Sequence, residues 1–233
     1  MLVIAYDNPT ISVNSYCLLF IDNKSIMVFK DNTEGSWARN MSHTRRSNHL
    51  KTIKSTPSER EVILGCIIGD GSLEKSGKHY RLRIGHTIRH RDYVRWKYNL
   101  LQRICITEPR YVPYTRSMRI GTIGHPELSK IRDQWYLNGT RQVPADFKLT
   151  PLMIAIWFMD NGCKHGESVD FSVHSYSKES IKILQIDLEE FGIDTTVNSD
   201  GKGSRLYVKR SSYDCFERLV KPYIQRCMAY KLP

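Results

Sequence analysis

The sequence lacks the features that mark several common classes of protein. Its six cysteines lie at positions 17, 66, 105, 163, 215 and 227 and form no CxxC pair, which argues against a zinc ribbon or a thioredoxin-type site. No stretch approaches the roughly 20 apolar residues of a membrane span. Residues 1–7 show no basic segment followed by a long apolar run, as a secretory signal would. We therefore expect a reducing compartment, either the bacterial cytoplasm or the matrix or stroma of an organelle.

The sequence also has fewer acidic than basic side chains. The 233 residues include 24 acidic and 35 basic side chains, which gives a formal net charge of +11. Such an excess indicates a polyanionic partner, and nucleic acid is the commonest, although a ribosomal or membrane-surface protein can be equally basic. The 40% apolar share is enough for an ordinary core, and the length allows one large domain or two small ones.

Two segments of the chain resemble each other. Residues 56–71 and 150–162 both begin with Thr-Pro, run apolar for about two turns and end in Asp or Asn followed by Gly. Thr is a common N-cap and Pro is accepted at the first helical position, while Gly is typical after a helix C-terminus. Thr56 and Glu59 also match a capping box. The pattern predicts two matched helices, each with a polar residue at its C-terminal end.

These two predicted helices are apolar on nearly all sides, so each must be buried on nearly all sides. Gly65 and Ala155 would permit a close approach of two backbones. Either helix alone could be an ordinary core helix of an α/β domain. The matched pair favours two helices that pack against each other.

Similar elements follow each predicted helix. After the first we expect a strand at 79–87, a helix at 91–104, a hairpin of 110–114 with 117–123, and a helix at 126–137. After the second we expect a strand at 169–174, a helix at 178–191, a hairpin of 195–198 with 205–209, and a helix at 213–220. The sequence therefore predicts an α+β protein built from two repeats.

The predicted strands alternate between apolar and polar residues. Leu82 and Ile84, for example, alternate with Arg81 and Arg83, which is typical of a sheet with one buried and one wet face. The wet faces carry side chains that contact base edges and phosphates, although a solvated face would look the same in any one strand. The candidate DNA-binding residues are Arg81, Arg83, His86, Arg116, Arg119, Ser172, His174, Asn198, Lys202, Arg205, Tyr207 and Lys209.

Residues 63–71 and 154–162 resemble the two copies of the motif that names the LAGLIDADG endonucleases. The Trp-Phe-Met-Asp form of the second copy, and residues 220–223 with 230–233, are similar to the omega-intron branch of that family in yeast mitochondria. The resemblance covers about residues 57–233. It implies an α+β fold of two pseudo-symmetric αββαββα repeats, residues 56–148 and 149–233, after an N-terminal extension of residues 1–55. Paired motif helices would lie at the centre, and two antiparallel sheets would form a DNA-binding saddle.

The resemblance also implies an active centre. The penultimate motif position supplies an acid that binds divalent metal near the scissile phosphates, and it corresponds to Asp70 and Asn161. Basic residues reach the centre from the repeat ends; Lys231 matches closely, and Arg141 stands where a lysine is found in the family. The implied catalytic residues are Asp70, Asn161, Arg141 and Lys231, and the implied metal set is Asp70, Asn161, Gly69 and Asp160. The expected ion is Mg²⁺ or Mn²⁺, with Ca²⁺ supporting binding without cleavage.

Asn161 alters the expected chemistry. Phosphodiester hydrolysis needs an activated water and charge relief on the leaving oxygen, which metal ions on hard oxygen ligands supply. An amide oxygen is neutral and a weaker ligand, and Asp160, about 100° away around the helix, should not simply replace the acid. We expect metal-dependent DNA binding with poor cleavage or cutting of mainly one strand. Asn161 is either a natural loss or an introduced change that traps uncut DNA; the otherwise intact motif favours the second.

Two other functions would explain the missing acid. They are a group I intron maturase, which binds its own intron RNA, and a DNA-binding regulator without catalysis. The retained Asp70, Arg141 and Lys231 favour an endonuclease that acts as a monomer on double-stranded DNA. In the extension, apolar strands around Asp22-Asn23-Lys24 predict a hairpin over residues 15–30. Residues 39–54 are basic and indicate either a linker or a DNA-contacting arm.

Overall fold

The computed structural model describes residues 12–13, 16–21, 24–28, 43–199, 201 and 203–233. The chain divides into two compact units, residues 1–46 and residues 47–233. Within the described ranges, no helix is long and apolar enough to cross a membrane.

The first unit contains a small antiparallel sheet. Strands β1 (Ser12–Val13), β2 (Tyr16–Ile21) and β3 (Lys24–Val28) pair in that order. Strands β2 and β3 pair antiparallel within the range predicted for the hairpin, while residues 22–23 of its turn lie outside the described residues. Helix α1 (His43–Leu50) falls where the sequence indicated only a basic linker or arm. Its residues include a single aliphatic side chain, Leu50, so no apolar stripe marks this helix in the sequence.

The second unit consists of two halves with the same order of elements. The first half contains α2 (Pro57–Ile68), β4 (Ser72–Ser76), β5 (His79–Thr87), α3 (Arg91–Leu101), β6 (Arg110–Val112), β7 (Ser117–Gly121), α4 (Pro126–Trp135) and the short pair β8 (Tyr136–Leu137) and β9 (Thr140–Arg141). The second half contains α5 (Pro151–Asn161), β10 (Gly162–His165), β11 (Ser168–Ser172), α6 (Lys178–Glu190), β12 (Thr195–Ser199), β13 (Ser204–Val208) and α7 (Tyr213–Val220).

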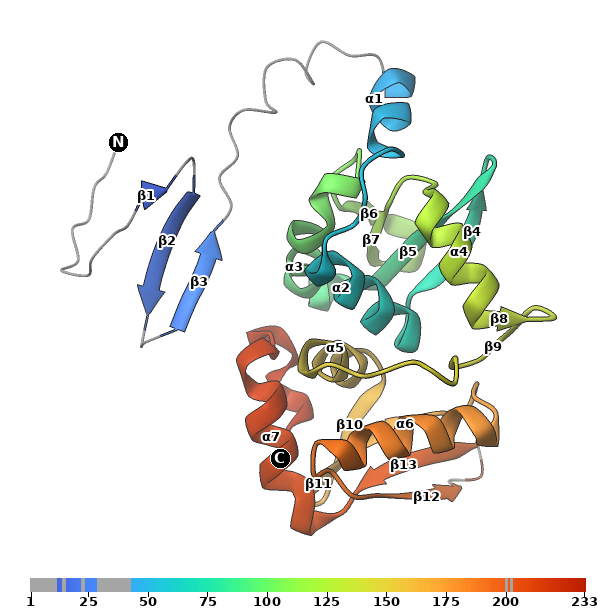
Figure 1. Cartoon of the computed structure of the whole chain (residues 1–233). Helices are drawn as coiled ribbons and strands as arrows, with labels where there is room; N and C mark the ends of the chain where they lie inside the picture. The colour runs from blue at the N-terminus through green and yellow to red at the C-terminus, as the bar shows by residue number, and fades with distance from the viewer. Residues whose placement is uncertain (1–11, 14–15, 22–23, 29–42, 200, 202) are drawn as a thin grey trace. The chain divides into compact units, whose positions relative to one another are not determined.

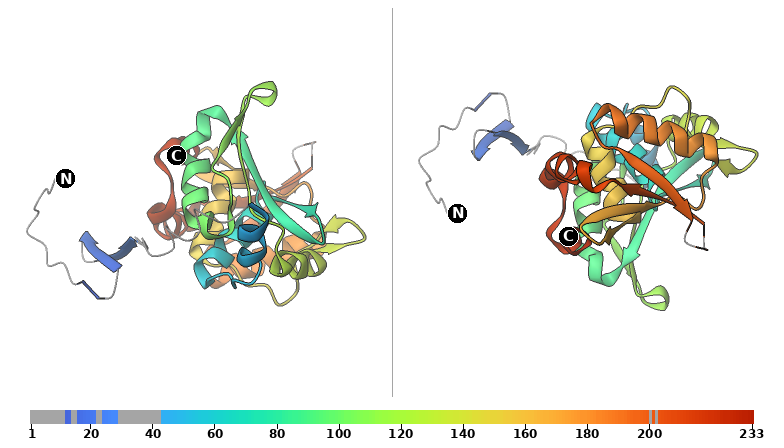
Figure 2. Two further views of the ribbon diagram at one scale, coloured as in Figure 1. Left: turned by 90° about the horizontal axis from the view of Figure 1, so that it is seen from above. Right: turned by 90° about the horizontal axis from the view of Figure 1, so that it is seen from below.

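The two halves also share one sheet topology. Their four-stranded antiparallel sheets have the orders β4-β5-β7-β6 and β10-β11-β13-β12, which are equivalent strand by strand. Helices α2 and α5 lie against each other in the middle of the unit (Figures 1 and 2). Helices α3 and α4 contact the first sheet, and α6 contacts the second. This arrangement confirms the predicted α+β fold with paired motif helices between two antiparallel sheets.

Five of the described strands differ from the sequence-based expectations. Strands β1, β8 and β9 are short, and β8 corrects the predicted helix of residues 126–137, which ends at Trp135. The other two belong to the four-stranded sheets. Strands β4 and β10 form the outer strands that directly follow α2 and α5. Strand β4 contains only one apolar residue, Leu73, and β10 reads Gly-Cys-Lys-His, so neither shows the alternation that identifies a strand. They form because each pairs along its length with the strand after it, β5 or β11.

The first sheet has one buried and one polar face, as the alternation predicts, whereas in β11 of the second sheet Ser168 and Asp170 are buried as well. In β5, Leu82 and Ile84 are buried while Arg81 and Arg83 point to the opposite side. In β11, Val169 and Phe171 are fully buried. Arg81 and Arg83, two of the predicted DNA-binding residues, therefore lie on the polar face of the first sheet.

The helix caps place α2 and α5 as expected from the two Thr-Pro pairs. Thr56 and Glu59 form a complete capping box, and Thr150 accepts a hydrogen bond from the Met153 N–H. The Thr150 hydroxyl also donates to Glu61 at 3.0 Å, which links the start of α5 to α2. Both helices therefore begin at defined residues, and their C-terminal ends fall at Ile68 and Asn161.

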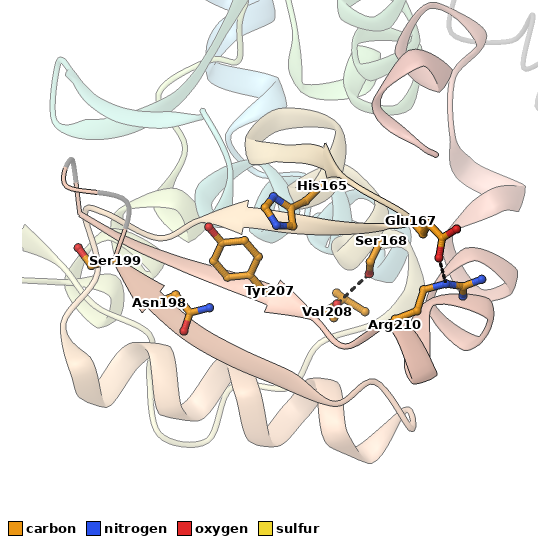
Figure 3. Close-up of a pocket in the computed structure, with 8 residues that line it drawn as sticks. All are labelled: His165, Glu167, Ser168, Asn198, Ser199, Tyr207, Val208 and Arg210. Carbon is orange, nitrogen blue, oxygen red and sulfur yellow. Dashed lines mark hydrogen bonds and ion pairs between the residues drawn. The ribbon is translucent and has the colours of Figure 1, made fainter.

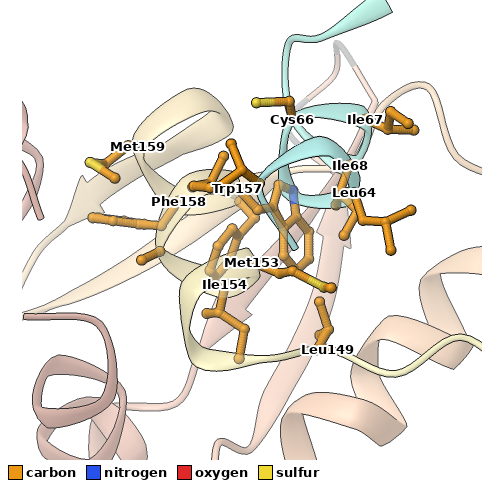
Figure 4. Packing of buried hydrophobic residues seen from close by; sticks show 14 of the residues in the cluster. Leu64, Cys66, Ile67, Ile68, Leu149, Met153, Ile154, Trp157, Phe158 and Met159 are labelled. Atoms are coloured by element: carbon orange, nitrogen blue, oxygen red, sulfur yellow. The ribbon is translucent and has the colours of Figure 1, made fainter. Parts of the chain in front are cut away.

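The packing of α2 against α5 forms the centre of the hydrophobic core (Figure 4). A Cβ atom on Gly65 would lie 3.1 Å from Ile156 Cβ and 3.2 Å from the Met153 backbone. Trp157 of α5 stacks on Phe171 of β11, with ring centroids 4.2 Å apart, and so joins the helix to the second sheet. Gly65 is therefore required for the close approach of the two helices.

We predict that Gly65→Val destabilises the protein by about 1–3 kcal/mol, because the added side chain overpacks a closed interface. Urea unfolding followed by circular dichroism measures the change. Gly121→Ala is the control, since its Cβ would meet only Leu82 O at 3.8 Å. Equal stabilities of the two variants would show that the helices do not approach as described.

Candidate active centre and nucleic-acid interface

The C-terminal ends of α2 and α5 bring Asp70 and Asn161 side by side. Asn161 Nδ2 donates a hydrogen bond to Asp70 Oδ1 at 2.9 Å. The Asp70 side chain keeps 44% of its surface exposed. The two penultimate motif residues therefore meet at the surface rather than in the hydrophobic interior, as the pairing of the helices predicts.

Arg141 and Lys231 occupy equivalent places at the two helix ends. Arg141 donates to the carbonyls of Ile67 and Gly69 at 2.5 and 3.1 Å. Lys231 donates to the carbonyls of Met159 and Asp160 at 2.6 and 3.1 Å. Cations are favourable there because the last carbonyls of a helix carry partial negative charge. Each half of the chain thus supplies one basic residue to the end of its own motif helix.

Asp160, assigned to the metal set, has a buried carboxylate. Lys97 Nζ of α3 lies 2.7 and 3.0 Å from its two oxygens, and both side chains are 0% exposed. The Tyr93 hydroxyl donates to Asp160 Oδ1 at 2.8 Å, and the Asp70 N–H donates to Oδ2 at 3.1 Å. The Asp160 carboxylate is therefore held by groups of the first half, although it belongs to the second.

The sequence does not identify Lys97 as a residue of the candidate site, and it places His86 among the DNA-binding residues. Lys97 interrupts the apolar stripe of α3 formed by Tyr93, Val94 and Leu101, and this interruption was the available signal. His86 lies on the same side of β5 as Leu82 and Ile84, and its side chain is 7% exposed. Its Nε2 lies 3.4 Å from Asp160 Oδ1. The structure therefore places His86 beside the buried carboxylate rather than on the polar face expected for a DNA-binding residue.

The electrostatics of this cluster follow from burial and close charges. Burial, followed by the charge of Asp160, raises the pKa of Asp70. Burial would also raise the pKa of Asp160, but the ammonium of Lys97 and the other partners hold that pKa below its usual value. Burial would lower the pKa of Lys97, but Asp160 keeps it raised. Burial lowers the pKa of His86 to about 4, so its ring is neutral near pH 7, and burial also lowers the pKa of Lys231.

The residues present fit a hydrated divalent ion at Asp70. Asp70, His86 and Asp160 each present an atom within 4.8 Å of the others. Lys97 engages both oxygens of Asp160, whereas Asp70 is half exposed and its Oδ2 lies 4.0 Å from His86 Nδ1. Mg²⁺ commonly uses one or two carboxylates and completes its shell with waters and substrate phosphates. Asp70 is therefore the residue of this cluster best placed to hold such an ion.

A pocket of about 390 Å³ joins this centre to the first sheet. Asp70 and Lys231 line it together with Thr87, Ser117 and Arg119 of β5 and β7. Tyr230 completes one wall and stacks on His90, with ring centroids 6.0 Å apart. The end of the chain therefore closes onto the first half beside Asp70.

The polar face of the first sheet carries a row of arginines. Arg83 pairs in register with Gly121, and Arg119 with both Gly85 and Arg110. Arg81 and Arg83 both contact Glu74, at 3.2 and 3.1 Å. Arg110 shares this face but was not among the sequence-predicted residues, although it belongs to the predicted hairpin. Arg116 is among the sequence-predicted residues and lies in the tight turn before β7, with a φ of 46°.

The polar face of the second sheet carries less positive charge than that of the first sheet. Arg205 donates to Asp170, which is buried, and His165 Nδ1 lies 3.6 Å from the same carboxylate. Asn198 and Tyr207 line a pocket of about 590 Å³ on this face, together with Ser168 (Figure 3). The remaining predicted residues are distributed as follows: Ser172 pairs with Arg205, His174 is exposed after β11, Lys209 contacts Asp194 at 3.4 Å, and Lys202 lies outside the described residues.

Comparison with known proteins agrees with this architecture. Residues 60–216 match the LAGLIDADG DNA endonuclease family. The chain is 26% identical over 209 residues to cytochrome b mRNA maturase bI2 of Debaryomyces hansenii, with 81% of this chain and 79% of the relative covered. It is 25% identical over 207 residues to DNA endonuclease I-ChuI of Chlamydomonas applanata, with 76% and 95% covered.

A similar fold is found among solved structures. The homing endonuclease I-WcaI, solved bound to its DNA recognition sequence, has a TM-score of 0.70 and 24% identity, with 80% of this chain and 91% of that chain covered. The family match covers more than half of the chain, and the paired motif helices and the two equivalent sheets agree with it. The chain belongs to the LAGLIDADG DNA endonuclease family.

Proposed function

We propose that this protein is a sequence-specific, metal-dependent DNA endonuclease that cuts mainly one strand of its target. The observation that carries the proposal is the meeting of Asp70 and Asn161 at the ends of α2 and α5, with one basic residue at each helix end. Only one of the two penultimate positions bears a carboxylate. The chain would act as a monomer, since both halves of the centre lie in a single chain.

The proposed chemistry assigns a separate task to each residue. Asp70 would hold Mg²⁺ or Mn²⁺ against a scissile phosphate, and Lys231 would place its positive charge in the same pocket. The bound ion supplies an activated water and charge relief on the leaving oxygen. Arg141 would neutralise phosphate charge at the end of α2, whereas Lys231 lies at the end of α5. Tyr230 and Arg119 would exclude bulk water from the sides of the pocket.

Asn161 is the reason for expecting unequal cleavage of the two strands. Its amide nitrogen donates to Asp70 Oδ1, so the pair is stable without any cation. Two carboxylates at the same distance would repel each other unless a cation lay between them. The second centre therefore has no acid of its own at the motif position. Separately, we expect that Ca²⁺ in place of Mg²⁺ supports DNA binding without cleavage.

The polar faces supply the surface for duplex DNA. Arg81, Arg83, Arg110 and Arg119 share the face of the first sheet, with Glu74 as an acidic neighbour. Arginine contacts both phosphates and the guanine edge, whereas the Asn, Ser and Tyr side chains of the second face offer neutral donors and acceptors. We infer that the first half contributes more of the electrostatic affinity.

A second candidate function is RNA splicing. One relative is named a cytochrome b mRNA maturase. The loss of one metal-binding acid would impair RNA binding less than it would impair DNA cleavage. Parallel binding measurements with duplex DNA selected from a random library and with structured intron RNA would separate the two. Tighter binding of the RNA at equal salt would favour the maturase, and binding of the duplex without any cutting would favour a regulator.

The parent protein should convert supercoiled plasmid bearing its target into nicked circles in Mg²⁺, and Asn161→Asp should yield linear DNA. The same variant should lose about 1–3 kcal/mol of stability in EDTA, because it replaces a hydrogen bond by a carboxylate pair. Mg²⁺ should recover part of that loss, since an ion that binds only the folded state stabilises it. Gel electrophoresis and thermal unfolding provide the two measurements.

Asn99→Asp is the matched control, because it makes the same chemical change on the exposed side of α3. It should alter neither the cleavage products nor the effect of Mg²⁺ on unfolding. Efficient double-strand cleavage by the parent protein would contradict the role given to Asn161.

Duplex binding should weaken steeply with salt, because phosphate contacts release counterions. Arg83→Gln and Arg119→Gln should each reduce the slope of log Kd against log salt by about 1 if each side chain contacts one phosphate. Arg95→Gln on the exposed side of α3 is the control and should leave the slope unchanged. A flat salt dependence of the parent protein would rule out the proposed DNA-binding faces.

A further inference from the structure

A buried ion pair joins Lys97, which lies outside the two motif copies, to Asp160, which lies within the second copy. Neither side chain is exposed to solvent, and Nζ lies 2.7 and 3.0 Å from the two carboxylate oxygens. The ammonium is also 4.2 Å from the centre of the Tyr93 ring and 3.3 Å from His86 Nε2. Burying two charges is costly unless each is closely paired and hydrogen-bonded, as these are.

This ion pair connects the two halves at Asp70. Lys97 belongs to α3 of the first half and Asp160 to α5 of the second, and Asp160 Oδ2 accepts the backbone N–H of Asp70 at 3.1 Å. A Cβ atom on Gly69 would lie 2.3 Å from the same oxygen, so the carboxylate rests directly on the backbone before Asp70. Asp160 therefore contacts the backbone that carries the Asp70 carboxylate on both sides of the Gly69–Asp70 peptide.

The pair occurs at only one of the two equivalent places. The buried positions of α3 are Tyr93, Val94, Lys97 and Leu101, and those of α6 with the same spacing are Ser180, Ile181, Leu184 and Leu188. Leu184 thus corresponds to Lys97, and Gly69 corresponds to Asp160 in the motif. The equivalent positions, Gly69 and Leu184, carry no charge, whereas Lys97 and Asp160, which adjoin the Asp70 backbone, both do.

We propose that Lys97 and Asp160 are positioning residues that hold the Asp70 backbone and carboxylate in the orientation needed for one acid alone to bind a divalent cation. This inference rests on the proposed function, which it extends by naming the groups that make the Asp70 centre the active one. Lys97 acts through Asp160, because its ammonium engages both oxygens of that carboxylate. Asp160 acts through the Asp70 N–H and does not itself bind the ion.

Two measurements that need no cleavage test this proposal. The first is hydrogen exchange of the Asp70 amide, and the second is Mn²⁺ binding to the free protein, followed by electron paramagnetic resonance. In Lys97→Met the Asp70 amide should exchange roughly 10- to 100-fold faster, because its acceptor loses the charge partner that fixes it. Mn²⁺ affinity should fall by roughly 10- to 100-fold, as for other groups that orient a metal ligand.

The chain contains a second lysine–aspartate pair that serves as a control, with an exposed lysine and a buried aspartate. Lys148 Nζ lies 3.2 Å from Asp187 Oδ1, Asp187 is buried, and its Oδ2 accepts the Leu149 N–H at 2.8 Å. Lys148→Met should speed exchange at Leu149 without changing exchange at Asp70 or the affinity for Mn²⁺. Asp70→Asn provides the reference for a centre without its metal ligand.

Further variants separate positioning from stability. Asp160→Leu removes the acceptor of the Asp70 N–H, and Lys97→Met/Asp160→Leu replaces Lys97→Met in the test if that variant does not fold. In Lys97→Met/Asp160→Leu both buried charges are gone, so the melting temperature should recover relative to Lys97→Met. Mn²⁺ affinity should remain low in the double variant, because the orientation of Asp70 is still lost.

The proposal is overturned if exchange at Asp70 rises only as much as exchange throughout α2 and α5, with Mn²⁺ affinity within twofold of the parent protein. It is also overturned if the double variant recovers Mn²⁺ affinity together with stability. Absence of plasmid cleavage by the parent protein would reject the proposed function alone, because neither measurement uses cleavage.

Discussion

The contact between α2 and α5 is the constraint on which the rest of the structure depends. Their close approach at Gly65 lets both helices end at the same place, and only then can residues from two distant parts of the chain share one centre. A wider separation would leave the two sheets without a common support, since Trp157 joins α5 to β11. The same packing that provides the hydrophobic core therefore provides the geometry of the candidate site.

The ends of these helices form a negative surface that the chain balances with its own cations. Terminal carbonyls, Asp70 and Asp160 lie within a small volume, and Arg141, Lys231 and Lys97 approach them from three different elements. Asn161 adds a neutral donor to this balance. The result is a centre that is electrostatically compensated before any ligand arrives, with one half-exposed carboxylate left facing the pocket.

Much of this architecture could be predicted from the sequence because it depends on periodic patterns. The apolar runs predicted α2 and α5, and alternation predicted β5, β7, β11 and β13. Strands β4 and β10 could not be predicted, because pairing with a neighbouring strand, rather than their own composition, makes them strands. The place of Asp70 beside Asn161 followed from the motif, whereas the partner of Asp160 did not. Lys97 lies 63 residues from Asp160 along the chain, and only the tertiary fold brings them together.

The division of the Lys97–Asp160 pair between the halves also limits how such a protein can be recombined. A chimaera that took one half from this chain and the other from a relative lacking the matching residue would bury an uncompensated charge at the junction. Removal of one member of a buried pair typically costs about 3–5 kcal/mol, a large part of the stability of an ordinary domain. The two repeats are thus not independent modules, and successful exchange of a half requires that the incoming half carry a residue that matches the charge retained at position 97 or 160.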